Sequence, residues 1–251
     1  MRVRRLISGV GQSDFSKNVI VEMANEIISY LEMCQREDAS LQRGMNYRLG
    51  GNQSVILMSV RPNAPYEDRI EDDGATLVYE GHDVPRSQKY ANPKLVDQPE
   101  FTPSGSLTEN GKFHKAAQEY KQGVRAPELV RVYEKIRQGI WSYNGLFELV
   151  DSWRENDDYR QVFKFKLVIT EEETDYFSGA ANSTEPSRVI PTSVKLEVWK
   201  RDGGKCVVCG ATDELHFDHI IPFSRGGTSL RAENIQLLCA RHNLEKRDKI
   251  L

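Results

Sequence analysis

The sequence lacks three features that would each narrow the search for a function. No apolar run is long enough to cross a bilayer, and residues 6–10, after the basic start Met1–Arg5, are too short and too polar for a signal peptide. There is also no basic excess, since 34 Lys and Arg stand against 37 Asp and Glu, a net charge of −3. We therefore expect a cytoplasmic protein, and any nucleic-acid partner must be argued from local sites.

Cysteine is scarce, and its distribution is uneven. Cys34 stands alone, whereas Cys206, Cys209, Cys239 and His242 form two pairs, each with a two-residue gap, with 29 residues between the pairs. Two turns that each offer two ligands suit a tetrahedral Zn²⁺ ion, and in a cytosolic chain this grouping favours metal over a disulfide. Four protein ligands leave no position for a reactive water, so the spacing predicts a structural zinc site.

The N-terminal two thirds of the chain have the pattern of a β-rich domain. Apolar residues at helical spacing predict a helix over residues 18–37, with Cys34 as a buried thiol on its apolar stripe. Strand-like runs follow at 54–60, 75–81, 144–153 and 161–169, while 127–137 fits a helix or a strand. Residues 83–113 contain four prolines and suggest a long loop, a feature that is usually functional in compact domains.

A change of composition marks the boundary with the C-terminal part. Residues 171–190 are acidic and then rich in small polar residues, as in a linker. Ser193 is expected to cap a helix through Trp199, which Gly203 and Gly204 would end. We therefore divide the chain into 1–170, a linker 171–190, and 191–251. The last part has ten Lys and Arg against eight Asp and Glu, and the rest has 24 against 29.

Between the two zinc pairs lies the sequence LHFDHIIPFSRGGTSLRAENIQLLC, which predicts strands at 215–221 and 235–238 and a helix at 240–247. The series C-x2-C, D-H-I-x-P-x-S-x-G-G, an Asn before L-L-C, and x2-H-N-x2-K resembles the HNH (ββα-metal) nuclease family over residues 195–249. The last zinc ligand is His242 where many members of that family have Cys, and imidazole serves zinc equally well.

The HNH resemblance implies a role for each matching residue. His219 would be the general base that activates water, and Asn234 would tie the loop that orients it. Asp218 and Asn243 would hold one catalytic Mg²⁺ or Mn²⁺ ion. Arg225 and Lys246 would meet DNA phosphates. His216, two residues before Asp218, would either touch phosphate or pack in the core.

Three stretches of the N-terminal part resemble the SRA (YDG) domain, which binds 5-methylcytosine. They are GGNQSVILMSVRPNAPYEDRIEDDGATLVYEGHD (50–83), NGKFHKAA (110–117) and WSYNGLFELVDSWRENDDYRQVFKFKLV (141–168). In the last stretch Asn144 replaces the Asp of the Tyr-Asp-Gly signature, which is a structural residue in that family.

The SRA resemblance implies base flipping, in which a modified cytosine stacks between two aromatic rings while a carboxylate accepts from its amine. These groups map to Tyr66, Tyr79 and Asp68, although the spacing between the tyrosines is one residue longer than in the family. The alternative without a binding role is that both tyrosines are core aromatics and Asp68 is a turn residue. The loop 83–113 would enter the grooves of the DNA, with Arg86, Lys89 and Lys94 as its charges.

Together these features predict an α+β protein with an N-terminal SRA/PUA-like curved sheet, flanking helices and a small C-terminal ββα-metal domain. Its expected function is cleavage of double-stranded DNA that carries 5-methylcytosine or 5-hydroxymethylcytosine, as in a type IV-like restriction endonuclease. A homodimer is a further expectation, for cleavage of both strands. The alternatives are an HNH endonuclease that reads an unmodified sequence and a modified-DNA binding protein that does not cleave.

Overall fold

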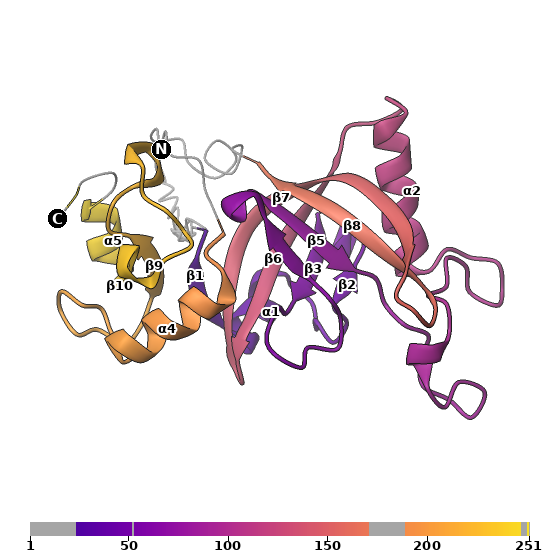
Figure 1. Ribbon diagram of the computed structural model, residues 1–251, viewed down its shortest axis with the longest axis horizontal. Helices are drawn as coiled ribbons and strands as arrows, with labels where there is room; N and C mark the ends of the chain where they lie inside the picture. The colour runs from indigo at the N-terminus through magenta and orange to yellow at the C-terminus, as the bar shows by residue number, and fades with distance from the viewer. Residues whose placement is uncertain (1–23, 52, 171–188, 247–249, 251) are drawn as a thin grey trace, which may run out of the picture.

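The computed structural model describes residues 24–51, 53–170, 189–246 and 250. In this part of the chain ten strands form one sheet, in the order β10-β9-β1-β7-β6-β3-β2, and β8, β5 and β4 continue from the far end of β7 (Figure 1). We call residues 24–170 the N-terminal region and 189–246 the C-terminal region. No described helix is both long enough and apolar enough to cross a membrane.

The N-terminal region is a curved sheet with one long helix packed on it. Its helical elements are α1 (Tyr30–Arg36), η1 (Leu49–Gly51), η2 (Asp72–Gly74), η3 (Pro93–Leu95) and α2 (Glu109–Lys121). Its strands are β1 (Glu26–Ser29), β2 (Met45–Asn46), β3 (Ser54–Met58), β4 (Arg69–Glu71), β5 (Thr76–Glu80), β6 (Glu128–Arg137), β7 (Ile140–Asn156) and β8 (Gln161–Ile169). The main core lies between the sheet and α2, where Phe113 meets Phe147 and Phe165.

The long strand β7 organises this sheet. Its first half pairs with β1 and β6, and its second half pairs with β8. The register slips between the pairs Val132–Gly145 and Tyr133–Tyr143, which leaves Asn144 as an extra residue on β7. A bulge of this kind bends a strand and re-aims a side chain, so Asn144 is placed by an irregularity of the sheet.

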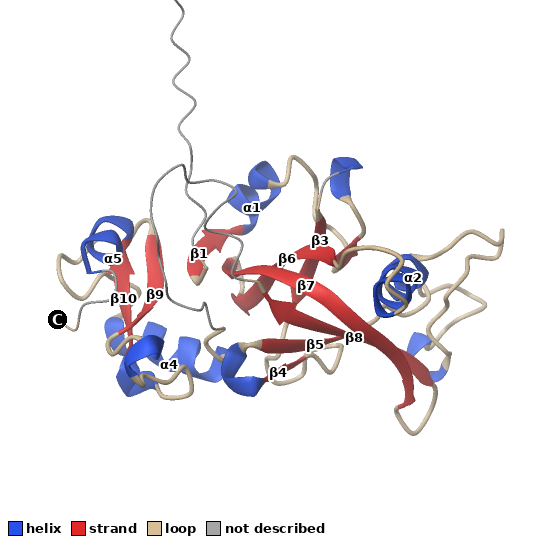
Figure 2. Ribbon diagram, turned by 90° about the horizontal axis from the view of Figure 1, so that it is seen from above, coloured by secondary structure: helices blue, strands red, loops and turns tan. Residues whose placement is uncertain are grey.

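The C-terminal region is a small ββα unit preceded by a helix. It consists of α4 (Thr192–Asp202), β9 (Leu215–His219), η4 (Phe223–Arg225), η5 (Ala232–Asn234), β10 (Ile235–Cys239) and α5 (Ala240–Lys246). Strand β1 lies between β9 and β7, so the sheet runs without a break from one region into the other (Figure 2). The predicted β-rich region with flanking helices and the small ββα unit are both confirmed.

The helix predicted over residues 18–37 is wrong in part. Residues 18–23 lie outside the described residues. Residues 26–29 form strand β1, because their apolar side chains pack into two different cores on opposite sides of the strand. The helix starts after Ser29, whose side chain and backbone form a capping box with Glu32. Leu31, placed on the apolar stripe by the periodicity, is 67% exposed, and Cys34 is half-buried.

Two other local predictions are settled by the structure, and the predicted linker lies mostly outside the described residues. The ambiguous segment 127–137 is strand β6. Helix α4 begins one residue before Ser193 and has Pro191 at its N-cap, so Ser193 is not the cap, whereas Gly203 ends the helix in a left-handed conformation, as predicted. Of the predicted linker, 171–188 lies outside the described residues, and Val189 and Ile190 are buried in the cores of the two regions.

Candidate functional site

The predicted zinc ligands come together at one end of the C-terminal region. The ligand atoms of Cys206, Cys209, Cys239 and His242 all lie within 4.8 Å of one another. Cys206 and Cys209 sit in a turn after α4 that is closed by the hydrogen bond from Gly210 N to Cys206 O (2.8 Å). Cys239 ends β10, and His242 lies one turn later in α5. Three thiol sulfurs and one imidazole nitrogen at this spacing fit a Zn²⁺ ion.

The end of β9 carries the predicted catalytic pair. Opposite it, β10 supplies Gln236, whose amide donates to Asp218 Oδ2 (3.0 Å). The Nε2 atom of His219 lies 3.0 Å from the hydroxyl of Ser229, which is buried in the following loop. Ser229 was not singled out in the sequence, because a serine in a glycine-rich loop has no spacing that marks it.

Asn234 closes the loop between β9 and β10. Its Oδ1 atom accepts from the backbone N–H of Ile221 (2.8 Å), and its Nδ2 donates to the carbonyls of Ile221 (3.0 Å) and Thr228 (3.1 Å). Gly227 is required beneath it, since a Cβ at that position would lie 1.8 Å from the carbonyl oxygen of Ile221. The loop that presents Ser229 to His219 is therefore held by the amide of Asn234.

The structure places Lys246 differently from the sequence-based assignment to phosphate. Its side chain is 1% exposed, and its ammonium lies 3.1 Å from Asp218 Oδ2 and donates to the carbonyl of His219 (2.6 Å). The reason is that α5 packs against β9, so a lysine in its last turn faces the strand end. Arg225 is exposed in η4, and Asn243 is half-buried in α5.

Of the two alternatives for His216, the structure supports packing. The ring is 4% exposed, and among the described residues its Nδ1 has no hydrogen-bond partner. Burial, helped by the nearby Arg36 guanidinium, lowers the pKa of His216 to about 4. A ring that stays neutral and covered is part of the core between β1 and β9.

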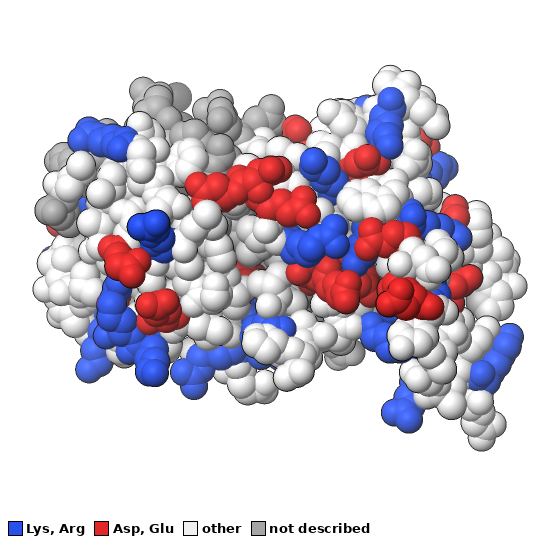
Figure 3. Space-filling model, viewed as in Figure 1, with Lys and Arg blue, Asp and Glu red and all other residues white. Residues whose placement is uncertain are grey.

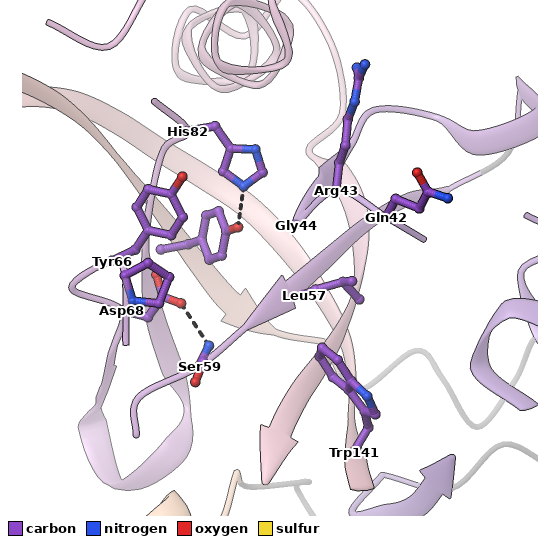
Figure 4. Close-up of a pocket in the computed structure, with 11 residues that line it drawn as sticks. Gln42, Arg43, Gly44, Leu57, Ser59, Tyr66, Asp68, His82 and Trp141 are labelled. Carbon is purple, nitrogen blue, oxygen red and sulfur yellow. Dashed lines mark hydrogen bonds between the residues drawn. The ribbon is translucent and has the colours of Figure 1, made fainter. Parts of the chain in front are cut away.

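A pocket of about 430 Å³ opens in the N-terminal region and contains all three predicted base-binding residues (Figure 4). Tyr66 lies in the segment before β4, and Tyr79 lies on β5 with its ring 2% exposed. Asp68 is the acid that lines the pocket, whereas Glu67 and Glu71, its neighbours in sequence, do not line it. The longer spacing between the tyrosines still allows both rings to line the pocket with Asp68.

Asp68 is fixed by two backbone amides. Its Oδ2 accepts from Ser59 N and its Oδ1 from Glu80 N, both at 3.0 Å. Burial raises the pKa of Asp68 to about 7, although these two hydrogen bonds act in the opposite direction. The carboxyl group therefore changes its charge close to neutral pH.

His82 is a pocket residue that the sequence reasoning missed. Its Nε2 lies 3.0 Å from the Tyr79 hydroxyl, and its ring stacks on Tyr66 at a centroid distance of 5.4 Å and an interplanar angle of 18° (Figure 4). Burial lowers the pKa of His82 to about 4, so the ring is neutral. Gly44 faces both groups, and a Cβ there would come within 2.8 Å of His82 Nε2 and of the Tyr79 oxygen.

The loop predicted at 83–113 is present up to the start of α2, and it contacts Tyr66 of the pocket. Lys94 lies over the Tyr66 ring, 4.2 Å from its centroid, and pairs with Asp83 at 3.2 Å. Arg86 and Lys89 are exposed. On the face in Figure 3, Lys and Arg gather along the lower edge near α4, and acids concentrate over the sheet of the N-terminal region.

Comparison with known proteins gives two kinds of match. Residues 206–249 match the family described as HNH endonuclease, so this part of the chain is similar to HNH nuclease domains. A comparison with curated proteins gives no match.

Solved structures that resemble the chain include SRA domains. The SUVH5 SRA domain with hemi-methylated CG DNA has 22% identity and a TM-score of 0.42, over 66% of this chain and 95% of that one. The same domain bound to fully hydroxymethylated CG DNA has 21% identity and a TM-score of 0.40, over 61% and 91%. Arabidopsis thaliana SUVH6 with SAM has 18% identity and a TM-score of 0.38, over 66% of this chain and 33% of that one.

Proposed function

We propose that this chain is a modification-dependent DNA endonuclease, in which the N-terminal pocket binds a flipped 5-methylcytosine and the HNH domain hydrolyses a phosphodiester bond. One observation carries the proposal: a pocket with two tyrosines and a buried acid is built into the same sheet as the strand that bears Asp218 and His219. The sequence motifs of residues 50–83 and 141–168 support the assignment of the pocket.

In the nuclease step, His219 takes a proton from the attacking water. The 3.0 Å contact between Nε2 and the Ser229 hydroxyl orients the ring, and a neutral imidazole has one nitrogen whose lone pair can accept this proton. The contacts of Asn234 hold the loop of Ser229 and so fix the orientation of the ring. Arg225, exposed in the same loop, supplies charge for a phosphate oxygen.

Asp218 and Asn243 are the residues that would hold a divalent ion here. The Asp218 carboxylate and the Asn243 side-chain oxygen are hard ligands of the kind that Mg²⁺ and Mn²⁺ bind. When bound, such an ion supplies charge stabilisation at the scissile phosphate and the leaving 3′ oxygen. Lys246 holds Asp218 from the side of α5 (3.1 Å), so we assign it to orienting this ligand instead of to DNA contact.

In the reading step, the base stacks against the rings of Tyr66 and Tyr79, and its exocyclic amine donates to Asp68. The two backbone amides fix the direction of this carboxylate. An acceptor at that position distinguishes cytosine from thymine, because thymine has a carbonyl where cytosine has the amine.

The biological role that follows is restriction of foreign DNA carrying modified cytosine, with two chains acting together where both strands are cut. The test compares three plasmids of one sequence that are unmodified, 5-methylated or 5-hydroxymethylated, each incubated with protein and Mg²⁺ or Mn²⁺. We expect cleavage of the modified plasmids. Equal cleavage of the unmodified plasmid would favour an endonuclease that reads ordinary sequence. Selective binding without cleavage would favour a modified-DNA binding protein.

A further inference from the structure

A fully buried charged group joins the two regions. Lys195 lies on α4 of the C-terminal region, and its side chain is 0% exposed. Its ammonium donates to Glu134 Oε2 on β6 at 2.8 Å and to Asn144 Oδ1 on β7 at 2.7 Å. Burial lowers the pKa of Lys195, and Glu134 counters that effect. Both acceptors belong to the N-terminal region, so the contact crosses from one region to the other.

The remaining polar atoms of this cluster are also satisfied. The Asn144 amide donates to Glu134 Oε2 at 3.0 Å, and the hydroxyl of Thr192, at the start of α4, donates to Glu134 Oε1. A buried ion pair of this kind adds little net stability, because desolvation cancels most of the attraction. Its hydrogen bonds are directional, however, and they fit one placement of α4 on the sheet.

Asn144 has the residue type that this cluster needs. An amide can donate to the Glu134 carboxylate and accept from the Lys195 ammonium at the same time. The Asp expected at this position in the Tyr-Asp-Gly signature would put a second carboxylate beside Glu134 and would have no hydrogen to donate. The β7 bulge directs Asn144 to this position. The departure from the signature therefore coincides with the docking contact of the nuclease helix.

Two further attachments join the regions close to the same place. Asn25 N donates to Tyr143 O at 2.6 Å, and Asn25 O accepts from Phe217 N at 3.1 Å, so residues before β1 connect β7 to β9. Val189 belongs to the core of the N-terminal region, and Ile190 belongs to that of the C-terminal region. Two residues after Phe217, the same strand β9 ends in His219.

We propose that Lys195, with Glu134 and Asn144, is a positioning device that fixes the nuclease on the reader. The distance from the modified base to the cut is then set by this docking and not by the length of the connecting chain. The inference rests on the proposed function for its readout on DNA, whereas the docking itself can be measured without DNA.

The main variant is the double replacement Lys195→Met with Glu134→Gln, which removes both buried charges and keeps the volumes. The matched control is Lys200→Met, an equal change at an exposed position of the same helix. A linear duplex with one 5-methylcytosine is cut, and the new ends are mapped by sequencing. We expect the range of cut positions to widen about twofold in the double variant only, because relative motion is the default for loosely joined domains. Its affinity for the modified duplex should not change.

Hydrogen exchange separates a failure of docking from a failure of the proposed function. In the double variant the Phe217 amide, bonded across the junction, should exchange about tenfold faster or more, while amides of β3 and β6 stay protected. If the wild-type protein cuts no modified DNA, the proposed function fails, and exchange alone decides the docking. A folded double variant with unchanged exchange or an unchanged cut range overturns the inference. If the double variant does not fold, Thr192→Val supplies the same two readouts with a smaller expected change.

Discussion

The folds of the two regions are stabilised in different ways. In the N-terminal region a large apolar core between the curved sheet and α2 holds the fold and supports the pocket. The C-terminal region has two small clusters, and one of them consists largely of Cys206, Cys239 and their neighbours Leu215 and Leu238. A unit of that size buries little surface, so a metal ion on the Cys/His cluster and the pairing of β9 with β1 would take the place of a larger core.

The chemistry of the two sites differs in the same way. The walls of the pocket keep water away from Asp68 and His82, and burial moves the pKa of each far from its ordinary value. The candidate nuclease residues Asp218 and His219 lie at a strand end, and Arg225 in the loop that follows is exposed. Under the proposed function, recognition would occur where the groups are desolvated, and cleavage would occur where a large substrate can dock.

Removing zinc should show the largest difference between the regions. Cys206→Ser or chelation should unfold residues 189–246, because metal binding is coupled to folding in such small units. The N-terminal core should keep its melting transition, since β1 still pairs with β7. Calorimetry with metal analysis measures both transitions, and Cys34→Ser is the control. Unchanged melting of both regions after verified zinc loss would show that the metal is not structural.

His219→Ala should separate cleavage from binding. Loss of a general base lowers the rate by about 10²–10⁴-fold, while affinity for modified DNA, which depends on the other region, should stay the same. Single-turnover cleavage and a binding titration measure the two quantities. His114→Ala is the matched control, because His114 lies on α2, far along the chain from the nuclease site. Cleavage within about fivefold of wild type would remove His219 from the base role.

Asp68→Ala should weaken binding to modified duplex by roughly 1–3 kcal/mol, the cost of leaving a buried donor unpaired. Weak, salt-sensitive binding to unmodified DNA should remain, because phosphate contacts supply it. Titration of both duplexes against Asp68→Ala and against the control Glu71→Ala gives the comparison. Equal losses on both duplexes, or none, would mean that Asp68 does not read the base.

The smallest expected effect is a pH dependence of reading. The pKa of Asp68 is raised to about 7 in the free protein, so the group gains a proton as the pH falls below that value. The charged carboxylate is the stronger acceptor for the base amine, so affinity for modified DNA should fall by at most about tenfold per pH unit below neutrality and level off above it. The ratio of the two dissociation constants, measured against pH, reports this slope. Asp68→Asn should remove this dependence on pH. If that variant kept the wild-type slope, the pH dependence would come from a group other than Asp68.

The sequence was most informative where a residue type is required by local chemistry. The zinc ligands follow from spacing, because metal geometry acts over short distances. The β9 and β10 strands follow from the local apolar pattern, and the pocket tyrosines follow from the SRA resemblance. Contacts between distant segments were not predictable. Lys246 was assigned to phosphate because the HNH resemblance implies that role, whereas the packing of α5 on β9 turns its side chain inward.

Two further errors have the same origin. The apolar residues of 18–37 repeat at helical spacing, yet Ile27 and Ile28 face two different cores that a periodicity count cannot separate. His82 enters the pocket because the irregular segment after β5 brings its ring over Tyr66, and no pattern in one sequence marks such a placement. Sequence patterns gave local elements and ligand sets, while tertiary packing decided which side chains face each other.

Strand β1 limits how the C-terminal region can be transferred from one protein of this kind to another. It covers the side of β9 that faces away from β10 and one side of β7, and it comes from the opposite end of the chain. A nuclease transplanted by a cut within residues 171–188 would leave this strand behind and expose the backbone of β9, which invites aggregation between copies. A transferable cassette must therefore include residues 24–29, for example through a circular permutation that places them before α4.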